Sequence, residues 1–143
     1  MATDMETEAP TVLLDASAAI ALVVEDHAAH AATLRALRGY RLGLAGHAWF
    51  ETYSVLTRLP GGLRRSPGDV LRVLTRDFPA SCFLGEAEAA SLGPELGGLA
   101  IAGGAAYDAL VGATARHHGR RLVSRDARAR PVYEALGVDL ELL

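Results

Sequence analysis

The sequence contains no lysine, because all 14 of its basic residues are arginine. This absence excludes any mechanism that depends on a catalytic lysine, although a GC-rich genome is a sufficient cause of the bias. Cysteine is almost as scarce: Cys82 stands alone, which excludes an internal disulfide and a cysteine-based zinc site. Cys82 lies in an apolar run, so we expect a buried, inert thiol.

Long apolar runs are also missing. The longest falls well short of the ~18 residues that a membrane-spanning helix requires, so we expect no membrane association. The chain does not open with a basic segment followed by an apolar one, so no secretory signal is visible. These features favour the cytoplasm.

The charge balance is mildly acidic, with a formal net charge of −3. That value argues against a simple basic nucleic-acid binder that neutralises phosphates over a wide face. Hydrophobic residues make up 50% of the chain, which disfavours disorder, and 143 residues suit one compact domain. Residues 1–10 are acidic and polar, so we expect a flexible tail there and a single domain over residues 11–143.

Short apolar runs alternate with amphipathic segments along the chain. The apolar runs predict strands at residues 11–14, 41–45, 80–84, 120–123 and 138–142. The amphipathic segments predict a helix capped by Ser17, helices over residues 26–38, 47–59, 86–96, 105–118 and 127–136, and one opened by Ser66 and Pro67 with Val70, Leu71, Leu74 and Phe78 as its apolar face. The alternation predicts an α/β fold with a central parallel sheet between helical layers.

Four acids stand in apolar or small-residue surroundings. Asp15 and Asp126 each follow a predicted strand, while Glu51 and Asp108 lie early in predicted helices that begin where strands have ended. In open parallel sheets, ligands bind outside the carboxyl ends of the strands. We therefore expect all four side chains at one edge of the sheet.

Carboxylates gathered in this way repel one another. In a partly desolvated cleft the repulsion costs several kcal/mol, so either one group is protonated or a cation neutralises the set. Ligands that are all oxygen suit Mg²⁺ or Mn²⁺, which can activate water and stabilise charge on a phosphodiester. Each acid alone also has a simpler interpretation, as a helix cap, a first-turn acid or a solvated residue.

At this point the sequence resembles the PIN-domain family and, within it, the VapC toxins. The similarity extends from about residue 11 to residue 143. Residues 12–18 resemble the family's apolar strand with its first acid and nearby serine, and residues 47–58 resemble the helix with the second acid. Residues 107–110 resemble the helix with the third, and residues 122–129 the final acid motif. The four motifs follow in the correct order.

The resemblance implies a three-layer α/β/α sandwich whose clustered acids bind Mg²⁺ or Mn²⁺. It implies an endoribonuclease that cuts structured RNA such as tRNA or rRNA, is inhibited by a VapB-like antitoxin and forms a homodimer. The metal-site acids carried over are Asp15, Glu51, Asp108 and Asp126, and Ser17 and Ser124 resemble the polar neighbours that hold acids or waters in place. The number of metal ions and the cleavage position stay open.

Other residues carry weaker hypotheses. The arginines that cluster near the Gly61–Gly62 turn could grip RNA phosphates or could form a solvated helical face; they are Arg58, Arg64, Arg65, Arg72 and Arg76. His47 lies one helical turn before Glu51, which suggests a substrate contact or an indirect role in the site.

Two other functions compete with the nuclease. A phosphoacceptor or aspartyl phosphatase domain also places acids at strand ends, but it normally requires a lysine, and a phosphatase also needs a second Asp where Ala16 and Ser17 stand. A non-catalytic PIN-like module that only binds a partner is the second rival. The presence of all four acids disfavours it.

Overall fold

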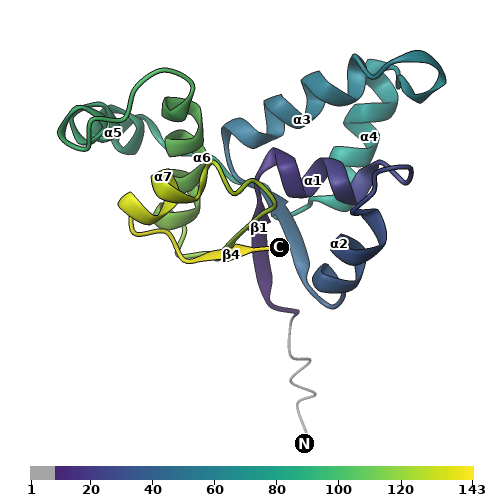
Figure 1. The fold of residues 1–143 in the computed structure, drawn as a ribbon, viewed down its shortest axis with the longest axis horizontal. Coiled ribbons are helices and arrows are strands. Elements are labelled where there is room, and N and C mark those ends of the chain that lie inside the picture. The colour runs from purple at the N-terminus through teal and green to yellow at the C-terminus, as the bar shows by residue number, and fades with distance from the viewer. Residues whose placement is uncertain (1–8) are drawn as a thin grey trace, which may run out of the picture.

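The computed structural model describes residues 9–143, and a four-stranded, entirely parallel sheet lies at its centre (Figure 1). The strands are β1 (Thr11–Leu14), β2 (Arg41–Leu44), β3 (Leu122–Ser124) and β4 (Leu140–Leu142), and their spatial order is β2-β1-β3-β4. The helices are α1 (Ala16–Val23), α2 (His30–Leu37), α3 (His47–Thr57), the 3₁₀ turn η1 (Gly61–Leu63), α4 (Pro67–Asp77), α5 (Glu86–Gly98), α6 (Ala105–His117) and α7 (Arg130–Ala135).

Apolar residues of β1 alternate between the two faces of the sheet. Val12 and Leu14 pack with α1 to α4 on one face, whereas Leu13 packs with α6 and α7 on the other. A further cluster joins α5 to the outer side of α6 and α7. The chain therefore folds into the predicted α/β/α sandwich, with α1–α4 on one side and α5–α7 on the other (Figure 1).

Helix α3 crosses from one apolar cluster to the other. Ala48 in its first turn packs with the α6–α7 side, whereas Leu56 in its last turn packs with the α1–α4 side. Gly46, which precedes the helix with a φ of 52°, makes this crossing possible. A Cβ atom at Gly46 would lie only 2.6 Å from Oγ1 of Thr114 in α6, so α3 and α6 approach closely at this point.

Several predicted elements are confirmed, and others are wrong in instructive ways. The predicted cap at Ser17 is wrong, because Asp15 caps α1 and accepts a hydrogen bond from the Ala18 backbone N–H. The helix expected over residues 26–38 begins only at His30, after a turn. Ser66 does cap α4 and accepts from the Asp69 backbone N–H. Leu71, placed on the apolar face, is 51% exposed.

The strand expected over residues 80–84 is replaced by an isolated bridge between Ala45 and Cys82. Backbone bonds still hold this segment beside β2, where Ala80 donates to the carbonyl of Leu42 and Cys82 to that of Leu44. The hydroxyl of Ser81, however, accepts the backbone N–H of Leu44 and interrupts the ladder. Side-chain competition for the backbone donor explains the error.

Cys82 lies in this bridge and is half-buried rather than buried. Its burial raises the pKa of the thiol, which favours the protonated and unreactive form. The raised pKa agrees with the predicted inert thiol, whereas the side chain is more exposed than predicted.

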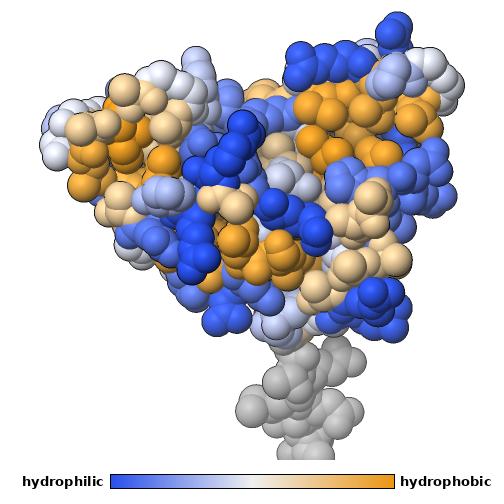
Figure 2. All heavy atoms as spheres, viewed as in Figure 1, coloured by the Kyte–Doolittle hydropathy of each residue, from blue (hydrophilic) through white to orange (hydrophobic). Residues whose placement is uncertain are grey.

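The expected tail at residues 1–10 falls mostly outside the described residues, and within them Ala9 and Pro10 are exposed. None of the helices in residues 9–143 is long and apolar enough to cross a membrane. On the face shown in Figure 2, apolar side chains gather over α5, at the α3–α4 end of the molecule and in a smaller group at the lower centre, with hydrophilic side chains between these groups.

Candidate active site

Asp15 lies at the carboxyl end of β1 and is the most deeply buried of the four predicted acids, at 5% exposure. Its Oδ1 accepts from the Ala18 backbone N–H at 3.2 Å and from Oγ of Ser17 at 2.5 Å. The strand end and the helix start that follows it therefore fix the carboxylate from two directions. A cap of this type also stabilises the helix, so this acid serves α1 as well as the site.

The second oxygen of Asp15 has a partner that sequence reasoning missed. Tyr133 of α7 is 1% exposed, and its hydroxyl donates to Oδ2 of Asp15 at 2.9 Å. Burial and the Asp15 carboxylate both raise the pKa of the phenol, so Tyr133 stays a neutral donor. Nothing in the local sequence signals this contact, because the two residues are 118 positions apart.

Two serines link the ends of β1 and β3. Oγ of Ser17 accepts the backbone N–H of Arg125 at 2.8 Å, and Oγ of Ser124 accepts that of Asp126 at 3.0 Å. The two hydroxyl oxygens lie 3.4 Å apart. The serines therefore tie the loop after β3 to the start of α1, which is the placement expected of polar neighbours that hold the acids.

Asp126 follows β3 and is half-buried, with 28% of its side chain exposed. Its Oδ1 accepts the backbone N–H of Arg128 at 3.0 Å and lies 3.3 Å from Nε of the same residue. The Arg128 side chain is 93% exposed, so this contact is formed in solvent and is weak. Arg128 lies close enough to lower the pKa of Asp108, which places it at the rim of the site.

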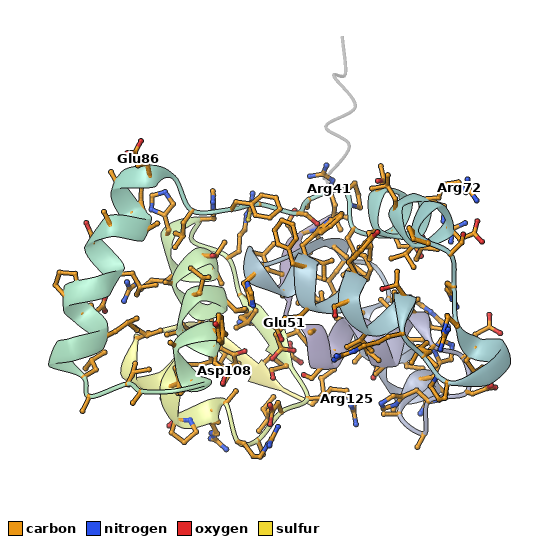
Figure 3. All side chains as sticks on the ribbon, turned by 90° about the horizontal axis from the view of Figure 1, so that it is seen from above. Arg41, Glu51, Arg72, Glu86, Asp108 and Arg125 are labelled. Atoms are coloured by element: carbon orange, nitrogen blue, oxygen red, sulfur yellow. The ribbon has the colours of Figure 1, made fainter. Side chains whose placement is uncertain are left out.

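Glu51 of α3 and Asp108 in the first turn of α6 complete the group, and their side chains point into the space between the two helices (Figure 3). We call Asp15, Glu51, Asp108 and Asp126 the acid cluster. Desolvation raises the pKa of Asp108, and the charges of Asp126 and Asp15 raise it further. The structure thus brings together acids from four separate parts of the chain.

The pKa of Glu51 is raised in the same way. Desolvation has the largest effect, Asp108 and Asp15 add to it, and His47 opposes it. Nε2 of His47 lies 3.6 Å from Oε1 of Glu51, one helical turn away. A nearby cation would stabilise the ionised forms of both Glu51 and Asp108.

The donor set fits a hard divalent cation. It supplies carboxylate oxygens, which together with water are the ligands that Mg²⁺ and Mn²⁺ prefer. Within residues 9–143, no three acid, histidine or cysteine side chains are already gathered closely enough to enclose an ion. Mg²⁺ usually keeps several of its waters and binds one or two carboxylates directly, so a loose acid group of this kind is compatible with it.

The predicted arginines lie elsewhere. Arg58 ends α3, about 10 Å along the helix axis from Glu51, as seven residues of helix imply. Arg64 donates to the carbonyl of Leu59, and Arg65 donates to that of Val23. Arg72 and Arg76 pair with neighbouring acids on α4. We call Arg58, Arg64, Arg65, Arg72 and Arg76 the arginine turn.

The sequence is similar to known proteins over most of its length. The family model described as PIN domain matches residues 12–135. Ribonuclease VapC27 of Mycobacterium tuberculosis (strain ATCC 25618 / H37Rv) is 46% identical over 129 residues, which cover 90% of this chain and 94% of that protein. Ribonuclease VapC40 of Mycobacterium tuberculosis (strain CDC 1551 / Oshkosh) is 44% identical over 133 residues, which cover 90% and 96%.

Proposed function

The chain belongs to the PIN-domain family, and from this premise we propose that it is a VapC-like endoribonuclease that hydrolyses RNA phosphodiester bonds with the help of Mg²⁺ or Mn²⁺. The observation that carries the proposal is the acid cluster, in which desolvation and mutual repulsion raise the pKa of both Glu51 and Asp108. A folded protein retains such a penalty where the charges serve a ligand or a reaction.

The four acids have three roles in this mechanism. Asp15 is held by three donors, so its oxygens have fixed positions and can define where a cation sits. Glu51 and Asp108 carry the destabilised charges and gain most from a cation. Asp126 completes the cluster from the loop after β3. When bound there, the ion would polarise the scissile phosphate and lower the pKa of an attacking water.

The remaining residues of the site position these acids. Tyr133 and Ser17 donate to the two oxygens of Asp15, which holds that carboxylate in a fixed orientation. Ser124 fixes the backbone of Asp126. Arg128 lies at the solvent side of the cluster, where a guanidinium can bind a phosphate oxygen of an approaching RNA.

The finer parts of the proposal come from similarity to VapC proteins. We expect the substrate to be a structured RNA such as tRNA or rRNA in the cytoplasm. We expect the active form to be a homodimer and a VapB-like antitoxin to inhibit it. A small neighbouring reading frame for a DNA-binding antitoxin, and co-purification of its product with this chain, would support the pairing.

The decisive experiment uses purified full-length protein and a pool of tRNA. Cleavage is measured with Mg²⁺, with Mn²⁺ and with an excess of chelator, and Asp108→Asn serves as the matched control. We expect cleavage that needs the metal and is absent in the variant. Cleavage that survives the chelator would refute metal dependence. A folded parent protein that leaves tRNA and rRNA intact under all conditions would favour the non-catalytic module.

A further inference from the structure

An aromatic pair lies beside the acid cluster. The rings of His47 and Tyr107 stack with their centroids 4.9 Å apart and an angle of 21° between their planes. His47 is the first residue of α3 and Tyr107 lies in the first turn of α6, so the stack bridges the two helices that carry Glu51 and Asp108. Close approach of these helices at Gly46 makes the stack possible.

The position of the pair relative to the acids is fixed by covalent geometry and by one contact. Tyr107 immediately precedes Asp108 in the chain. Nε2 of His47 lies 3.6 Å from Oε1 of Glu51. Because consecutive side chains of a helix point about 100° apart, it is the stack on His47, beside Glu51, that places the Tyr107 ring next to where the scissile phosphodiester would lie under the proposed function.

Tyr107 is 56% exposed, although it is a large ring in the middle of a structured region. One of its faces is covered by the imidazole of His47, which restricts its rotation without burying it. An exposed ring whose orientation is already fixed loses little conformational entropy on binding a flat ligand. Packing of α3 against α6 alone would not require this exposure.

Electrostatics near the site favour a neutral contact with RNA. The four carboxylates repel phosphates when no cation is bound, so beyond the phosphate contact of Arg128 at the rim, a further contact with RNA is better made to a group without charge. An aromatic face binds a nucleobase by stacking and needs no charge of its own. Sequence-specific and structured-RNA recognition usually involves unpaired bases that stack on aromatic side chains.

We propose that the stacked pair His47–Tyr107 forms a platform for the unpaired base of a nucleotide next to the scissile phosphodiester. This inference rests on the proposed ribonuclease function and adds a substrate subsite to it. Tyr107 supplies the face that meets the base, and His47 acts as a positioning residue that supports the ring. Because every base has a stacking face, the platform selects an unpaired nucleotide and tolerates any base.

The first test separates binding from chemistry. Tyr107→Leu removes the ring, Tyr107→Phe keeps it, and Phe83→Leu removes another exposed ring, 47% exposed, as a matched control. With a tRNA pool as substrate, we expect Tyr107→Leu to raise KM about tenfold while kcat changes little, as expected for the loss of one base stack. Tyr107→Phe and Phe83→Leu should keep the parent KM.

The second test measures stacking without cleavage. A short single-stranded RNA that contains 2-aminopurine is titrated into the Asp126→Asn variant with Mg²⁺, and again into the same variant with Tyr107→Leu. Stacking quenches 2-aminopurine, so we expect quenching with the first protein and its loss with the second. Asp126→Asn keeps an acceptor oxygen for the backbone of Arg128, so the loop should stay in place.

The outcomes are distinguishable from failure of the nuclease proposal. If the parent protein cleaves RNA but Tyr107→Leu keeps its KM and its quenching, the platform is wrong and the nuclease stands. An equal rise in KM for Phe83→Leu would also overturn the platform, because a general loss of apolar surface would then explain the effect. If the parent fails to cleave, the quenching experiment still decides whether Tyr107 stacks on a base.

Discussion

The acid cluster and the arginine turn carry charges of opposite sign, and they differ in how the surrounding protein compensates those charges. In the acid cluster, side chains from four distant parts of the chain meet, and their mutual repulsion and partial burial raise the pKa of Glu51 and Asp108. In the arginine turn the charges come from one stretch of the chain. Arg64 donates to the carbonyl of Leu59, five residues away, while Arg72 and Arg76 pair with acids one or three residues away, and only Arg65 reaches a distant group, the carbonyl of Val23.

This difference separates charges that serve a reaction from charges that serve the fold. A group that is satisfied by its sequence neighbours costs little and indicates little about function. The tertiary structure brings the like charges of the acid cluster together and leaves them partly uncompensated. Such an arrangement indicates a ligand or a reaction that these charges serve. From the sequence, the four acids already formed the stronger hypothesis, whereas the arginines were left open between an RNA contact and a solvated helical face.

The largest expected effect comes from Asp15→Asn. The amide has one acceptor oxygen where the carboxylate has two, so one of the donors from Ser17, Ala18 and Tyr133 would face an N–H group. We expect complete loss of cleavage and a loss of about 1–3 kcal/mol in the free energy of unfolding. Urea denaturation and the tRNA assay measure the two effects. Activity near that of the parent would contradict the assignment.

Asp108→Asn should also abolish cleavage, but with the opposite effect on stability. The pKa of Asp108 is higher in the folded protein than in the unfolded chain. The folded protein therefore loses stability as pH rises from the unfolded to the folded pKa, and this loss remains at neutral pH. Removing the carboxylate therefore raises the melting temperature by a few degrees at pH 7.

The pH dependence of this gain provides its control. We expect the difference in melting temperature between Asp108→Asn and the parent to shrink as pH falls, because protonation then removes the same charge from the parent. Mg²⁺ should raise the melting temperature of the parent more than that of the variant. A variant that melts lower than the parent at pH 7 would show that Asp108 stabilises the fold.

Tyr133→Phe should have a smaller effect on cleavage than the loss of either acid, because it leaves all four carboxylates in place. It removes the hydroxyl that donates to Oδ2 of Asp15 and leaves the buried ring in place. Hydrogen bonds to charged groups contribute about 1.5–3 kcal/mol, so we expect a decrease of that order in the free energy of unfolding together with reduced cleavage. Mg²⁺ titration should also show weaker binding. Unchanged stability and unchanged Mg²⁺ affinity would exclude a positioning role.

The smallest effect is expected in the arginine turn. Arg64→Gln with Arg65→Gln should weaken RNA binding by less than about tenfold and reduce the salt slope by about one or two, since each phosphate contact contributes roughly 0.7–0.9. Arg72→Gln is the matched control, because Arg72 is already paired with Asp69. Loss of cleavage as complete as that of Asp108→Asn would reverse the comparison between the two regions.

The sequence by itself determined most of the fold and the membership of the acid cluster. Strand β1, the helix caps at Ser66 and the acids at strand and helix ends follow from local spacing, because periodicity and capping act over a few residues. Local spacing gave wrong predictions where either of two neighbouring groups could bond to the backbone. Asp15 rather than Ser17 caps α1, and the Ser81 hydroxyl interrupts a strand that the apolar run alone predicted.

Only the tertiary structure decided how the acids are held and what surrounds them. The bond from Tyr133 to Asp15 and the stack of His47 on Tyr107 join side chains far apart in the sequence. The raised pKa values of Glu51 and Asp108 depend on the burial that packing creates. A short motif predicts which side chains lie at the end of a strand or helix. The pKa of each of these side chains depends instead on neighbours that come from distant parts of the chain.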